Sequence, residues 1–160
     1  LYNNQRVILT PTAVTHAAAL ERAHALWAAC GANLHTMDAT EHDHVFAAVS
    51  HLPHLLAFAY MNGVADDQTL ALAGPGFRDF TRIAASSPAV WRDIFVANRE
   101  PLLAQLAQFE IALAHLKSLV QLQVSEASDG NQADHNHQAL YDNLAQASAR
   151  RTNWQPNRSD

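Results

Sequence analysis

Strand signals occur only near the start of this chain. The run Val7–Thr10 combines β-branched and apolar residues and stops at a proline, which predicts a short strand. Residues 33–37 predict a second strand, and between the two the pattern predicts a helix over residues 12–30, capped by Gly31. In such a unit the two strands normally pair in parallel. Two strands alone do not form a stable sheet, so a larger sheet is implied. We therefore interpret residues 1–37 as the remnant of an α/β domain.

The rest of the chain is expected to be helical, which makes the fold mainly α. Alanine fills 31 positions, whereas there are only 5 glycines and 6 prolines. Asp38 and Glu41 resemble a capping pair that opens a helix reaching about Asn62, and Pro53 should interrupt and bend it. This helical domain is assigned to residues 38–154, with a frayed tail over 155–160. Further helices are expected over residues 67–73, 77–85, 100–124 and 135–151 and from Pro88 onward, with a loop over 125–134.

The helix expected over residues 100–124 carries a heptad pattern. A core helix packed inside one subunit would show the same pattern. A dimer interface between helices is favoured because Leu103, Leu119 and Leu122 add apolar surface beyond one narrow stripe. The seam residues, spaced 4, 3, 4, 3 and 4 apart, are Leu102, Leu106, Phe109, Leu113, Leu116 and Val120.

The charge balance limits the classes of partner. Ten basic residues stand against fifteen acidic ones, and Lys117 is the only lysine. This acidic balance argues against binding to nucleic acid or to a membrane surface. No apolar run reaches the roughly 18 residues of a membrane span, and there is no signal-peptide pattern. With Cys30 as the one cysteine, no intrachain disulfide can form, and a reducing, cytoplasmic location is expected.

Four of the ten histidines fall in one predicted helix: His42, His44, His51 and His54. His44 and His51 are two turns apart, about 10 Å along the axis, which is too far to share a metal ion. No cysteine or carboxylate completes a ligand set around His51 and His54, so no metal site is expected. Each histidine alone could simply hydrogen-bond in a polar cleft. As a group flanking Pro53 in an apolar stretch, they suggest the wall of a ligand pocket.

Arginines form a second cluster. Arg78 and Arg82 share a helix face directly after the turn predicted at residues 74–76, where a carboxylate or phosphate could bind. Solvated surface arginines are the alternative, and Trp91 could wall the pocket or pack in the core. No glycine-rich dinucleotide fingerprint or phosphate loop is present. The residues alone therefore indicate a helical dimer domain with a site for a small organic anion. Four arginines lie within 22 residues: Arg78, Arg82, Arg92 and Arg99.

Several motifs together resemble the prephenate dehydrogenase family. They are Glu-His-Asp at 41–43, Ser-His-Leu-Pro-His at 50–54, Gly-Phe-Arg-Asp-Phe-Thr-Arg-Ile-Ala at 76–84 and Pro-Ala-Val-Trp-Arg-Asp at 88–93. Their order and spacing resemble the family's C-terminal helical dimerisation domain. Residues 7–11 resemble the end of its Rossmann-type NAD(P)-binding domain, and the resemblance covers about residues 5–151.

The resemblance implies NAD- or NADP-dependent oxidative decarboxylation of prephenate to 4-hydroxyphenylpyruvate, in tyrosine biosynthesis. The alternatives are an arogenate dehydrogenase that gives tyrosine directly, or a non-catalytic helical module for dimerisation or ligand sensing. The family's nucleotide loop and catalytic histidine precede the region that this chain resembles. No catalytic residue is therefore expected here, and the chain alone is expected to be inactive. The implied partners are a second copy, bound through the helices, and a dicarboxylate substrate.

The resemblance also suggests roles for individual residues. Arg82 would bind the ring carboxylate, while His54 and Trp91 would line the pocket near the side chain of the substrate. His42 would shape the same pocket or act structurally. On an ideal helix His42 and His54 point about 120° apart, so both face one cleft only if the helix bends or the cleft is broad.

The motif that contains Arg82 includes two more substrate-binding candidates, Gly76 and Arg78. Pro75 stands within what is a glycine-rich run in the family, which puts backbone contacts from that turn in question. Arg150 and Arg151 are further candidates for approaching the partner's active site.

Overall fold

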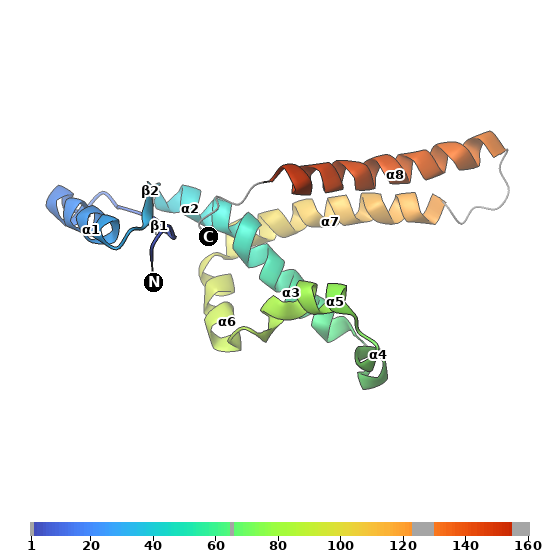
Figure 1. Cartoon of the computed structure of the whole chain (residues 1–160), viewed down its shortest axis with the longest axis horizontal. Coiled ribbons are helices and arrows are strands. Elements are labelled where there is room, and N and C mark those ends of the chain that lie inside the picture. Colours follow the sequence, from blue (N-terminus) through green and yellow to red (C-terminus); the bar gives the residue numbers. More distant parts are fainter. Residues whose placement is uncertain (1, 65, 123–129, 155–160) are drawn as a thin grey trace.

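The computed structural model describes residues 2–64, 66–122 and 130–154 (Figure 1). A small β-α-β unit leads into a set of helices, and the two longest helices form an antiparallel hairpin. In chain order the elements are β1 (Arg6–Leu9), α1 (Ala17–Ala29), β2 (Asn33–Thr36), α2 (Ala39–Phe46), a π-helical segment (Ala47–His51), α3 (Leu52–Gly63), α4 (Asp67–Ala71), α5 (Pro75–Thr81), a 3₁₀ segment (Arg82–Ala85), α6 (Pro88–Ala97), α7 (Arg99–Leu122) and α8 (Gly130–Asn153).

The β-α-β unit forms as expected, with β1 and β2 parallel and Val7 opposite Leu34. Its helix begins later than predicted, because the residues before it form a separate turn. In that turn the Thr12 N–H donates to Thr15 Oγ1 at 2.9 Å, a local bond that competes with helix formation. Gly31 ends the helix with φ of 78°, and a Cβ there would lie 2.5 Å from Asn3 Oδ1. The mainly α fold with a two-stranded parallel sheet is therefore confirmed.

The predicted long helix is three consecutive pieces: α2, the π segment and α3. Asp38 caps α2, since its Oδ1 accepts the Glu41 N–H at 2.8 Å, as the sequence predicts. Pro53 lies in the first turn of α3 and has no N–H to donate. Directly before it the helix widens, and the Leu52 N–H donates to Ala47 O, five residues back. The interruption predicted at Pro53 thus takes the form of a π turn on its N-terminal side.

Three other predicted boundaries were wrong. Residues 75 and 76 belong to α5 and are not a separate turn, because proline is favoured in a first helical turn. The helix expected over 77–85 ends at Thr81 and continues as a 3₁₀ segment, where the Thr81 hydroxyl donates to Phe77 O at 2.7 Å. The last helix begins at Gly130, within the predicted loop. The rest of that loop, residues 125–129, and the tail from 155 lie outside the described residues.

The helices leave much apolar surface uncovered. Few apolar residues are buried among the described residues, and two of them are alanines. They are Ala47, Ala57, Leu102 and Leu119. The chain exposes 12091 Å², whereas a compact monomer of its mass would expose about 7,900 Å². The helices therefore need further contacts to cover their apolar faces.

Along the predicted seam, Leu102 is buried, whereas Leu113 and Val120 are half exposed. Near its start α7 packs against the π segment. Along the rest of its length α7 packs against α8. The seam thus divides into a part buried within the chain and a part left open.

We expect Asp38→Ala to destabilise the helical domain by about 1 kcal/mol, because the first turn of α2 loses its side-chain cap. Urea unfolding followed by circular dichroism measures this as a lower transition midpoint. Asp38→Asn keeps an acceptor oxygen and serves as the control. An unchanged midpoint for Asp38→Ala would contradict the capping role.

Candidate functional site

An aromatic wall joins α3 to α6. The imidazole of His54 stacks on the Trp91 indole, with ring centroids 3.5 Å apart and planes 19° apart. Phe95 and then Phe58 extend the wall at centroid distances of 5.5 and 6.5 Å. His54 Nδ1 lies 2.9 Å from Ser50 O, which can only accept, so Nδ1 carries the proton. In the neutral ring, Nε2 is then left as an acceptor.

Beside this wall, His51 belongs to a partly buried polar network. Its Nδ1 is 3.0 Å from Asn98 Nδ2, which also donates to Asp43 O at 2.8 Å. Its ring meets Trp91 edge to face at 6.2 Å. Burial lowers the pKa of His51 most, and the charges of His42 and His54 lower it further, against an upward effect of Asp43. His51 is therefore held as a neutral ring near pH 7.

The π segment changes where His42 points relative to His54. A π turn adds one residue to a helical turn, which rotates everything after it by about 100° relative to a continuous α-helix. The separation of about 120° expected for the two histidines on an ideal helix falls to about 20°. The pKa of His51 is sensitive to both His42 and His54, which agrees with this convergence. On this geometry the π turn would turn the two histidines toward the same side of the helix.

His42 itself is part of the boundary between the helices and the β-α-β unit. It pairs with Asp43 Oδ1 at 3.0 Å and stacks on Phe46 at a centroid distance of 4.4 Å. Phe46 lines a cavity of about 320 Å³ that also includes Arg6 of β1 and His35 of β2. His42 therefore lies between this cavity and the His51 network.

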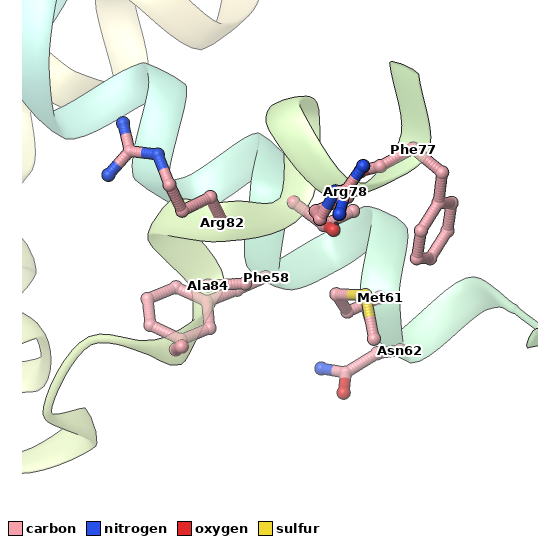
Figure 2. Close-up of a pocket in the computed structure, with 9 residues that line it drawn as sticks. Phe58, Met61, Asn62, Phe77, Arg78, Arg82 and Ala84 are labelled. Carbon is pink, nitrogen blue, oxygen red and sulfur yellow. Dashed lines mark hydrogen bonds between the residues drawn. The ribbon is translucent and has the colours of Figure 1, made fainter. Parts of the chain in front are cut away.

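Arg78 and Arg82 line a groove of about 580 Å³ between α3 and α5 (Figure 2). Figure 2 shows the Arg82 guanidinium extending away from Met61 and Asn62. Within the described part of the chain, neither arginine has a carboxylate partner, whereas Arg92 pairs with Asp93 at 2.8 Å. Two guanidinium groups without counterions beside an apolar floor form a suitable site for an anion with an apolar body.

Gly76 lies apart from the other candidates. It is in the first turn of α5, and a Cβ added there would meet nothing within 4 Å. It does not line the groove that contains Arg78 and Arg82. The structure therefore places the candidates in two neighbouring groups joined by α3, with Arg78 and Arg82 in one and the His54, Trp91 and His42 side chains in the other.

Sequence reasoning missed Asn98 and the apolar floor formed by Phe58 and Met61. Asn98 precedes a helix, and the Leu102 N–H donates to its carbonyl, so its position alone suggested only a helix boundary. Phe58 and Met61 sit in an apolar run that does not distinguish a groove from a core. In the described ranges, no group of three or more His, Cys, Asp or Glu side chains could hold a metal ion.

Comparison with known proteins decides the family. The sequence model described as "Prephenate dehydrogenase, dimerization domain" matches residues 38–140. The chain belongs to the prephenate dehydrogenase family.

Relatives in this family of oxidoreductases agree with the match. Cyclohexadienyl dehydrogenase of Zymomonas mobilis is 36% identical over 75% of this chain and 43% of its own length. Prephenate dehydrogenase of Bacillus subtilis is 33% identical over 79% of this chain and 35% of its own. The chain therefore spans less than half of these curated relatives.

A solved structure shows the same arrangement. Prephenate dehydrogenase from Aquifex aeolicus, in complex with hydroxyphenyl propionate and NAD+, superposes with a TM-score of 0.79 at 35% identity. The match covers 94% of this chain and 50% of the solved one. None of the described helices of this family member is both long and apolar enough to span a membrane.

The lowered pKa of His51 predicts a pH dependence of stability. The folded state binds a proton on the His51 ring less readily than the unfolded chain does. Above the ordinary pKa of 6.5 the ring is neutral in both states, so it does not lower the free energy of unfolding there. Stability is lost as pH falls below that value, until the folded ring also becomes protonated. The loss in unfolding free energy between about pH 7.5 and 5.5 should be smaller in His51→Gln than in the unsubstituted chain.

Chemical denaturation at each pH measures this difference. His44→Gln is the control, because His44 is exposed and bonds only within its own helix, through Nδ1 to Thr40 O. Equal slopes for His51→Gln and the unsubstituted chain would contradict the assignment.

Proposed function

We propose that this chain is the substrate-pocket and dimerisation part of a dehydrogenase that oxidatively decarboxylates prephenate to 4-hydroxyphenylpyruvate in tyrosine biosynthesis. In this reaction a hydride leaves the cyclohexadienyl ring for a nicotinamide, carbon dioxide leaves the same ring, and the ring becomes aromatic. Family membership and the similar structure with hydroxyphenyl propionate and NAD+ support the proposal. The single cysteine and the acidic charge balance support a reducing, cytoplasmic location without a nucleic-acid partner.

The observation that carries the proposal is the pairing of an aromatic wall with unpaired arginines. His54 and Trp91 are 37 positions apart in sequence, yet they stack at 3.5 Å. Arg82 lies on the 3₁₀ segment that packs against α3, the helix that carries His54. Prephenate has a flat ring with a carboxylate and a second carboxylate on its side chain. A guanidinium for the ring carboxylate and a stacked aromatic wall for the side chain would complement this shape.

The nicotinamide cofactor does not fit the residues present. The connection between β1 and α1, residues 10–16, contains Pro11 and no glycine, so its backbone is unsuited to the close approach that a pyrophosphate requires. The first turn of α1 also has no side-chain cap. We therefore assign NAD or NADP to a nucleotide-binding domain outside this chain and expect the chain alone to be inactive.

The uncovered surface supports a homodimer through the helices. The chain exposes more surface than a compact monomer of its mass would, and part of the excess is apolar side chains on α7 and α8. Leu113 and Val120 are half exposed, and Ile111 and Tyr141 are about two-thirds exposed. A second copy packed on α7 and α8 would cover these side chains.

Arogenate is the second candidate substrate. One relative is named cyclohexadienyl dehydrogenase, a name that does not specify prephenate. Arogenate differs from prephenate in carrying an amino group on the side chain, the part assigned here to the His54 and Trp91 wall. Steady-state kinetics of the whole enzyme with prephenate and arogenate, each with NAD and NADP, tests both candidates. Turnover of neither substrate would favour the non-catalytic module.

In the whole enzyme, Arg82→Ala should lower kcat/KM for prephenate by about 10- to 100-fold, because a charge-assisted hydrogen bond is lost. The KM for the cofactor should change little. Arg92→Ala, whose guanidinium is exposed and paired with Asp93, is the matched control. Unchanged prephenate kinetics in Arg82→Ala would remove Arg82 from the site.

We also expect this chain to sediment as a dimer at micromolar concentration. Leu113→Glu should weaken the dimer at least tenfold, because it places a charge in an apolar interface. Val14→Glu, at an exposed position in the turn before α1, is the control. A monomer for the unsubstituted chain in analytical ultracentrifugation would contradict the interface.

A further inference from the structure

Asn98 is the most buried polar side chain in the described residues, with 6% of its surface exposed. It lies between α6 and α7, and its carboxamide reaches across to α2 and the π segment. The two groups it meets there are Asp43 O and His51 Nδ1. The Asn98 network is defined by these three residues.

The orientation of the carboxamide follows from what each neighbour can accept. Asp43 O is a carbonyl oxygen and can only accept, so the NH₂ group must face it. A flipped amide would bring Asn98 Oδ1 against this carbonyl, with two acceptors facing each other. The second hydrogen of the NH₂ group then points to His51 Nδ1, 3.0 Å away. His51 Nδ1 must therefore offer a lone pair, and the proton of the neutral ring lies on Nε2.

His51 differs in this respect from the other histidines between residues 42 and 54. In each of the others Nδ1 faces an oxygen that accepts: Asp43 Oδ1 for His42, Thr40 O for His44 and Ser50 O for His54. In their neutral forms these rings leave Nε2 as an acceptor. His51 and His54 both contact Trp91, at 6.2 and 3.5 Å between centroids. Around Trp91, His51 thus carries its proton on Nε2, whereas Nε2 of neutral His54 is unprotonated and can accept a hydrogen bond.

We propose that Asn98 is a positioning residue that holds His51 as the neutral Nε2–H tautomer, so that His51 presents a hydrogen-bond donor beside the His54–Trp91 stack. On the function proposed above, this donor meets a carbonyl or carboxylate oxygen of the substrate side chain, while His54 Nε2 accepts a hydrogen bond. An imidazolium at His51 would set two donors face to face at Asn98.

The surrounding charges are consistent with a neutral ring. His42 and Asp43 act on His51 from α2 and His54 acts from α3, and burial is the largest effect on its pKa. At the start of α7, Arg99 and Glu100 are exposed and pair with each other at 2.7 Å. The tautomer itself is fixed by the Asn98 contact, which depends on geometry alone.

Long-range proton–nitrogen NMR of the nitrogen-15-labelled chain tests the tautomer directly. We expect an unprotonated Nδ1 and a protonated Nε2 for His51 at pH 7.5, and the opposite arrangement for neutral His54. A protonated His51 Nδ1, or an equal mixture of tautomers, in the unsubstituted chain would overturn the proposal. This measurement requires no variant to fold and no substrate.

Two variants test the role of Asn98. Asn98→Ala should leave His51 as a mixture of tautomers and raise its pKa toward the ordinary value, because the donor to the neutral form is gone. Asn98→Asp should put a proton on Nδ1 and raise the pKa of His51, since a carboxylate accepts from the ring and favours its charged form. Gln108→Ala, an exposed carboxamide on α7, is the control and should change neither property. An unchanged His51 tautomer in both Asn98 variants would overturn the positioning role.

Kinetics of the whole enzyme separate this proposal from the proposed function. Asn98→Ala should raise the KM for prephenate while leaving the KM for the cofactor unchanged, because His51 then presents the Nε2–H donor only part of the time. An unchanged prephenate KM together with the expected change of tautomer would overturn the substrate contact. If the enzyme turns over neither prephenate nor arogenate, the proposed function fails, and the NMR result still decides the role of Asn98.

Discussion

The widened helical turn at Ala47–His51 is the constraint on which the rest of the helical domain depends. It lies where α2, α3 and α7 meet, and Ala47 is fully buried there because only a small side chain fits between the helices. The turn shifts the register of α3 by one residue relative to α2, so histidines on both helices converge. Asn98 fixes this region from the α6–α7 corner by donating to Asp43 O. A π turn commonly marks a functional site, and this one carries His51 of the proposed pocket.

The helices that carry the proposed site also carry the proposed interface, and the chain by itself buries few large apolar side chains among its described residues. α3 carries His54 of the aromatic wall and also borders the arginine groove, and Phe58 belongs to both.

α7 runs from the Asn98 corner out to exposed leucines. An enzyme that closes its pocket with a second domain and a second copy leaves those faces apolar in the isolated piece. The exposed apolar area is consistent with the proposed dimer.

Local charge matters more to the proposed chemistry than the net charge of −5. Asp93 and Glu100 pair with neighbouring arginines at the surface, whereas Arg78 and Arg82 have no carboxylate partner among the described residues and line the groove. In the histidine group, burial is the largest of the effects that lower the pKa of His51 and favour its neutral ring. A dianionic substrate would thus meet fixed positive charge at one end and uncharged hydrogen-bonding groups at the other.

Much of this protein is determined by local sequence. The parallel strand pair, the Asp38 cap, the αL glycine at residue 31 and the long helix near residues 100–122 follow from signals a few residues long, and the motifs around His54, Arg82 and Trp91 indicate the family. Sequence periodicity alone could not place the π turn, because the apolar pattern over residues 38–62 fits a continuous α-helix that Pro53 merely bends. Nor could it find the stacking of His54 on Trp91 or the reach of Asn98 to His51 and Asp43, which joins positions 47 and 55 residues apart. The sequence by itself determined the elements and the chemistry they carry, since caps, turns and periodicity act locally. Only the tertiary structure decided which side chains meet, because the rotation of one helix against the next sets that outcome.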